Sequence, residues 1–70
     1  MKVYYDDAAD AIYIELNNVE PDGVIESDNG INLDTDSEGR IVGIEILNAS
    51  KKIDLSSLLT YSFEVKKKVV

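Results

Sequence analysis

Residues 10–16 read Asp-Ala-Ile-Tyr-Ile-Glu-Leu, and this stretch decides the fold because its apolar residues alternate strictly. Ile12, Ile14 and Leu16 occupy every second position, so they share one face of an extended chain. The alternation predicts a half-buried β-strand. Upstream, Lys2 to Asp6 is rich in valine and tyrosine and predicts a second strand beside it.

The first hairpin is predicted from the short segment between these two strands. Asp7 to Asp10 is polar at both ends, as a hairpin connection should be. If these residues form the loop, Tyr5 pairs with Ile12 on the apolar side of the hairpin. The same register places Tyr4 opposite Tyr13 on the reverse side, as a cross-strand aromatic pair.

Residues 31–47 predict a second hairpin, because two alternating stretches flank a polar turn that ends in Gly39. Glycine readily adopts the left-handed conformation that such a turn needs there. The predicted register brings Leu33 opposite Val42 and again gathers the apolar residues on one face. Val24 to Ser27 is expected to add a short strand.

The predicted fold is therefore α+β: an antiparallel sheet of two β-hairpins, with about four to five strands, and a short C-terminal helix or strand. Asp54 can cap a short helix that begins at Leu55. Tyr61 to Val65 alternates like a strand, so both possibilities stay open for residues 54–65. One domain is expected over residues 1–70, with a flexible tail at 66–70.

The reverse face of the sheet is predicted to carry four large apolar or aromatic residues. They are Tyr4, Tyr13, Ile41 and Leu47. Residues 54–63 are the segment expected to cover part of them. Whatever stays uncovered is a candidate interface, which predicts a homo-oligomer, most simply a dimer, with room for another protein partner.

Composition excludes several classes of function. The sequence has no cysteine and no histidine, which excludes disulfides, zinc–thiolate sites and the usual general base. No catalytic constellation is recognisable, so we do not expect an enzyme or a resident cofactor. The chain begins MKVYYDD, without the apolar stretch of a signal peptide, and no run is long enough to span a membrane. A cytoplasmic protein with no membrane contact is expected.

The net charge of −7 is distributed unevenly. Residues 1–50 carry two basic and twelve acidic side chains, whereas residues 51–70 carry five basic and two acidic ones. Such an acidic body should repel nucleic acid, which also argues against a base-stacking platform built from the four tyrosines. The basic end, with Lys66 to Lys68, can dock onto its own domain, onto a neighbouring copy or onto another molecule.

One motif suggests a cation site. From Asp34 the chain reads D-x-D-x-E-G-x5-E, the spacing of an EF-hand calcium loop. An EF-hand needs flanking helices, but both flanks here alternate like strands. In the predicted register Glu45 lies opposite Gly30, which is about 13 Å along the strand from Asp34. The alternatives are weak Ca²⁺ binding by Asp34, Asp36 and Glu38 alone, or a polar hairpin turn.

Two further groups carry reactive side chains and are interpreted as structural. Asp6, Asp7 and Asp10 cluster in the first turn, where aspartates commonly bond nearby backbone N–H groups. Ser50 and Lys51 lack the base and the glycine-flanked elbow that a serine nucleophile needs. Neither group predicts catalysis.

Two stretches carry a resemblance to a known family. YDDAADAIYI at residues 5–14 and GRIVGIEILNAS at residues 39–50 make the chain resemble the small prokaryotic domain-of-unknown-function family 2283 over about residues 2–53. The resemblance implies no activity and no catalytic residues. Small acidic proteins of this style are also similar to antitoxins that act on a neighbouring protein, which is a further alternative for function.

Overall fold

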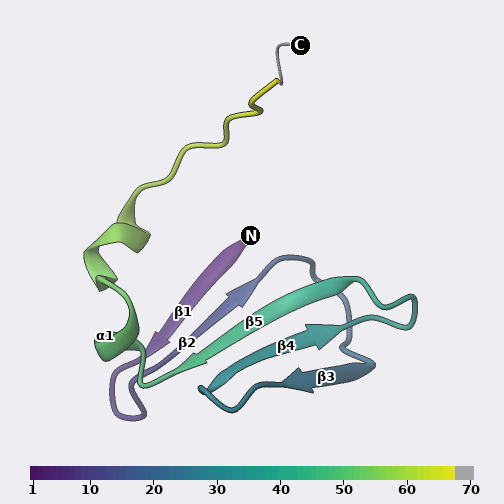
Figure 1. Ribbon diagram of the computed structural model, residues 1–70, viewed down its shortest axis with the longest axis horizontal. Helices are drawn as coiled ribbons and strands as arrows, with labels where there is room; N and C mark the ends of the chain where they lie inside the picture. Colours follow the sequence, from purple (N-terminus) through teal and green to yellow (C-terminus); the bar gives the residue numbers. More distant parts are fainter. Residues whose placement is uncertain (68–70) are drawn as a thin grey trace.

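Five strands form one antiparallel sheet in the computed structural model, which describes residues 1–67 (Figure 1). The spatial order of the strands is β1-β2-β5-β4-β3, so the last strand of the chain lies in the middle. The predicted antiparallel sheet is confirmed. Of the predicted tail at 66–70, residues 68–70 lie outside the described residues. The strands are β1 (Lys2–Asp6), β2 (Ala11–Glu15), β3 (Gly23–Glu26), β4 (Ile31–Thr35) and β5 (Ile41–Leu47).

The first hairpin has the register that its alternation predicts. Tyr5 pairs with Ile12 and Tyr4 with Tyr13. The Asp6 carboxylate closes the turn by accepting hydrogen bonds from the backbone N–H groups of residues 8 and 9 at 3.1 and 3.2 Å. Side-chain capping of this kind is why an aspartate begins the loop.

The predicted register of the hairpin between β4 and β5 is wrong by two residues. Leu33 lies opposite Ile44, not Val42. The turn contributes one residue of this shift, because Thr35 pairs with Ile41 where the predicted register places residue 40. A β-bulge between Asp34 and Thr35 adds the second, because Asp34 pairs with Gly43, which leaves Val42 without a partner in β4. From Ile31 to Asp34 the shift is an even number of residues, so these side chains keep their predicted faces.

The two faces of the sheet differ sharply in character. What we call the apolar face is formed by residues of all five strands whose side chains, by the pairing of the strands, point to the same side of the sheet. The other side, the polar face, carries most of the charged side chains of the strands. Members of the apolar face are Val3, Tyr5, Ile12, Ile14, Leu16, Ile25, Ile31, Leu33, Val42, Ile44 and Ile46.

Two short helical segments follow the sheet, α1 (Ala49–Lys52) and the 3-10 helix η1 (Leu55–Leu59). The predicted cap is confirmed, since the Asp54 carboxylate accepts a hydrogen bond from the Ser56 backbone N–H at 3.1 Å. η1 faces Val3 and Tyr5 across a cavity of about 390 Å³, so it lies on the apolar face. The expectation that this segment covers Tyr4 and Tyr13 is therefore wrong.

The core is small for the number of apolar residues in the sheet. Within residues 1–67, the buried apolar residues are Ile12, Val42 and Ala49. Val42 is 2% exposed, and its carbonyl accepts hydrogen bonds from the backbone N–H groups of residues 16 and 17 at 2.9 and 3.2 Å. The bulge therefore joins the end of the first hairpin to the core.

Alanine substitutions at two valines that differ in burial test which residues form this core. Val42→Ala should lower the free energy of unfolding by about 2 kcal/mol, because it removes buried methyl groups and leaves a cavity. Val24→Ala, at a position that is 54% exposed, should cost less than about 0.5 kcal/mol. Urea denaturation of both variants at one protein concentration measures the difference, and equal losses would place Val42 outside the core.

Candidate functional site

The Asp36 carboxylate, in the turn between β4 and β5, is occupied by hydrogen bonds within that turn. Asp36 is 8% exposed, and its Oδ1 accepts the backbone N–H groups of Glu38 and Arg40, both at 2.9 Å. Its Oδ2 accepts the Arg40 Nε–H at 3.0 Å. These contacts, with the Arg40 backbone N–H as the largest, hold the pKa of Asp36 below its usual value.

The other two predicted cation ligands point elsewhere. Asp34 lies on the polar face and accepts the Tyr13 hydroxyl at 2.8 Å, and Glu38 pairs with Arg40 Nη2 at 2.8 Å. Glu45 lies opposite Asn32, two residues closer to Asp34 than the predicted register placed it. Over residues 1–67 the structure brings no three carboxylates together in an arrangement that could hold a metal ion. The turn is thus engaged in hydrogen bonds of its own.

Asp10 connects the first hairpin to α1. Its carboxylate accepts the Ser50 hydroxyl at 2.7 Å, the Ser50 backbone N–H at 3.1 Å and the Tyr5 hydroxyl at 2.9 Å. The Ser50 hydroxyl contributes most to lowering the pKa of Asp10. Asp10 itself has a φ of 51°, a left-handed conformation that aspartate tolerates better than most residues. Ser50 therefore has a structural partner.

Tyr13 makes the most specific contact on the polar face. Its side chain crosses over β5 at Gly43 to reach Asp34 on the next strand. A Cβ at residue 43 would lie 2.0 Å from the Tyr13 hydroxyl oxygen, so only glycine leaves room for this crossing. The hydrogen bond to Asp34, together with partial burial, raises the pKa of Tyr13 to about 12.

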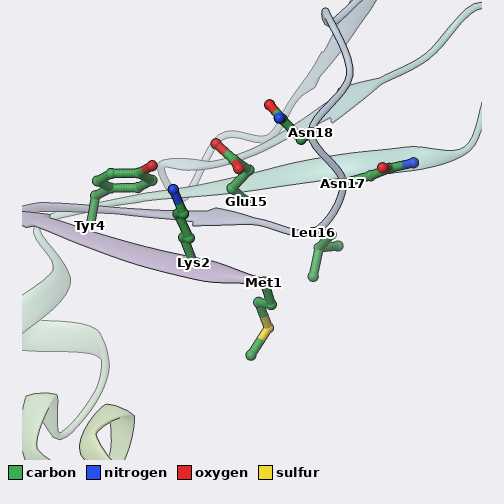
Figure 2. A pocket seen from close by; sticks show the side chains of 7 residues that line it. All are labelled: Met1, Lys2, Tyr4, Glu15, Leu16, Asn17 and Asn18. Carbon is green, nitrogen blue, oxygen red and sulfur yellow. The ribbon is translucent and has the colours of Figure 1, made fainter.

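The rest of the polar face also satisfies much of its own hydrogen bonding. The Asn32 amide donates to the Glu45 carboxylate at 3.0 Å. At the open end of the first hairpin, Lys2, Tyr4 and Glu15 line a hollow of about 340 Å³ (Figure 2). Its groups can donate and accept hydrogen bonds. None of these three side chains stands in a nucleophile–base pair of the kind that covalent catalysis requires.

The apolar face is the surface that the chain leaves without a complete covering. η1 lies over its β1 side, while Ile25 at the far side is 56% exposed. Figure 2 shows Met1 and Leu16 pointing to this side, opposite to Lys2 and Tyr4. No residue of the apolar face carries a charge. A charge-free sheet face of this kind is a candidate contact surface.

The interface residues predicted from sequence lie on the polar side or next to the bulge. Tyr13 is engaged with Asp34, whereas Tyr4, Ile41 and Leu47 are exposed. Their role as contact residues stays a prediction. Sequence reasoning took the apolar face as core and looked for an interface behind it. The missed signal was the absence, between residues 48 and 67, of a helical pattern long enough to cover five strands.

The pKa of Tyr13 gives a direct test of the polar face. Tyr13 should ionise near pH 12, against an ordinary value of 10.0. Because the folded pKa is the higher one, the hydrogen bond stabilises the fold fully below pH 10 and this contribution is lost as the pH rises toward 12.

Absorbance titration of the phenols checks this expectation. Tyr13→Phe should remove the step near pH 12, whereas Tyr61→Phe should leave it. Asp34→Asn and Gly43→Ala should both lower the pKa of Tyr13, the first by removing the anionic acceptor and the second by displacing the ring. A Tyr13 pKa that neither substitution changes would contradict the geometry.

Comparison with known proteins adds one finding about identity. No curated protein and no solved structure matched the chain. Over residues 1–67, no helix is long and apolar enough to cross a membrane. The model of the family described as "Protein of unknown function (DUF2283)" matches residues 2–50, from β1 into α1. The resemblance seen in the sequence is confirmed, and the chain belongs to the DUF2283 family, whose function is unknown.

Proposed function

We propose that this domain is a non-enzymatic protein-interaction module that self-associates in the cytoplasm, as a homodimer, through its apolar face. The observation that carries the proposal is that face itself. It is continuous over five strands, it has no charged member, and η1 stands only over its β1 side, across a cavity that leaves Val3 and Tyr5 exposed. Its exposed members are Val3, Tyr5, Leu16 and Ile25.

Charge favours a second copy on this face. The twelve acidic side chains of residues 1–50 lie on the polar face and in the turns, so two copies repel one another through most of their surfaces. Packing the two apolar faces together points both polar faces outward and keeps the acidic groups apart. Where η1 does not intervene, the two sheets can pack about 10 Å apart around a shared core.

The same features argue against other classes of function. Asp34, Asp36 and Glu45 already accept hydrogen bonds within the domain, which leaves no paired carboxylates poised for acid–base work at these positions. The acidic surface is unsuited to nucleic acid. A chain without cysteine also suits the reducing conditions of the cytoplasm.

The size of the face places the dimer at the weak end of known interfaces. Five strands of about five residues give a flat footprint of about 400 Å², and η1 already stands over the β1 part of it. Each partner in a standard stable interface buries about 800 Å². The sheets alone therefore support a modest affinity, and contacts from outside the sheets would strengthen it.

Two neighbouring residues on β3 test which face is buried. Ile25 and Val24 are 56% and 54% exposed and point to opposite faces of the same strand. Ile25→Gln should weaken self-association about tenfold or more, because it puts an amide into the apolar contact, whereas Val24→Gln should change it less than about threefold.

Sedimentation equilibrium of the unmodified chain and both variants measures these constants. Glutamine is neutral, so both substitutions leave the net charge unchanged. A chain that stays monomeric at high concentration would refute self-association, and a larger effect of Val24→Gln would place the contact on the polar face.

A further inference from the structure

The segment after η1 is an extended strand-like arm with one apolar side. Residues 60–67 read TYSFEVKK, and the apolar residues Tyr61, Phe63 and Val65 occupy alternate positions. In an extended chain they share one side. Phe63 is 86% exposed, and its two apolar neighbours in this pattern are also exposed. Solvent exposure of three such side chains in a row marks a segment built to contact another surface.

The arm leads away from its own sheet. Figure 1 shows it leaving η1 and running away from the sheet. Residues 60–67 contain neither glycine nor proline, the residues that most readily reverse a chain. The radius of gyration is 14.0 Å, against about 11 Å for a compact domain of 70 residues. The arm therefore extends away from its own sheet.

The free edge of β3 matches the arm in both hydrogen bonding and charge. β3 lies at the end of the sheet and has a neighbouring strand on one side only, so its outer backbone groups can pair with an added strand. Ile25 presents an apolar side chain next to that edge. Acidic residues surround the strand, and the arm ends in Lys66 and Lys67. The acidic residues are Glu20, Asp22, Glu26 and Asp28.

The other edge strand, β1, is a poorer partner. Its apolar side already faces η1, which begins the arm of the same chain. Its two charges, on Lys2 and Asp6, are of opposite sign. An arm that adds to β1 would meet less open apolar surface and less opposite charge than one that adds to β3.

One of the two possible face-to-face symmetries brings the arm of one copy to β3 of the other. In a face-to-face dimer with its two-fold axis parallel to the strands, the β1 side of one sheet lies over the β3 side of its partner. The arm begins on the apolar side of β1, beside Met1 and Val3. It therefore starts close to the edge that its sequence fits, and the exchange is reciprocal.

We infer that residues 60–67 form an exchanged strand that pairs with the β3 edge of a second copy and places Tyr61, Phe63 and Val65 beside Ile25. This inference rests on the proposed function. It adds contact area outside the two sheet faces and makes the association dependent on the ionic strength, because lysines approach an acidic edge.

A mixed-sample resonance experiment tests the exchange on the full chain. The sequence has no cysteine, so Glu64→Cys gives one site for a nitroxide spin label. The labelled copy, without nitrogen-15, is mixed with a nitrogen-15 copy of the unmodified sequence, so any broadening is intermolecular. We expect amide signals of Gly23 to Glu26 to broaden, and to recover when ascorbate reduces the nitroxide.

The outcomes separate this inference from the proposed function. Diffusion coefficients of a dimer with broadening at Lys2 to Asp6, or with no broadening, would refute the exchanged strand and leave self-association standing. Diffusion coefficients of a monomer would refute both. Broadening of β3 in a dimer supports both.

Two substitutions in the arm test which side makes the contact. Phe63→Asp should weaken dimerisation about tenfold or more, since it places a carboxylate in the apolar contact. Ser62→Asp adds the same charge to the opposite side of the extended segment and should weaken it less than about threefold. Residue 63 is exposed, so the fold should tolerate the change, which circular dichroism checks. Equal effects of the two, or no effect of either, would overturn the inference.

Discussion

The simultaneous pairing of β5 with β2 and β4 is the constraint on which the rest of the structure depends. Ile46 of β5 faces Ile12 on one side and Ile31 on the other, so one register of this strand determines both halves of the sheet. Because side chains alternate, it also determines both faces at once. At the bulge Val42 contacts both halves of the sheet. Its carbonyl accepts hydrogen bonds from backbone N–H groups at the end of the first hairpin, and its side chain packs in the core.

The separation of faces places carboxylates close together on the polar side, and neutral donors stabilise them there. Tyr13 donates to Asp34 and Asn32 donates to Glu45, without a cation in either pair. Gly43 makes the first contact possible by leaving the space that the tyrosine ring crosses. The polar face therefore has satisfied hydrogen bonds but keeps its negative charge. Such a face disfavours contact with another acidic copy.

The alternation of apolar residues within each hairpin predicted most of the sheet, but few of the contacts between strands that are distant in sequence. Alternation around Ile12 gave the first hairpin and its register, and Asp54 gave the helical cap. The second register was wrong because the alternation of a single hairpin shows neither the bulge at Val42 nor the pairing of Thr35 with Ile41 at the turn. The crossing of Tyr13 over Gly43 was equally out of reach, because it joins three strands that are distant in sequence.

Different parts of the chain form the sheet and the segments that follow it. Such a sheet needs a second layer, and residues 2–50, which match the family, contain the sheet but only the start of α1. The partial cover comes from η1 and the apolar arm comes from residues 60–67, both beyond the matched region. The family region thus supplies a surface that must be covered, and the segment that follows it supplies apolar side chains able to cover it. In this chain η1, the segment that stands over the β1 side of the sheet, is therefore encoded outside the part that matches the family.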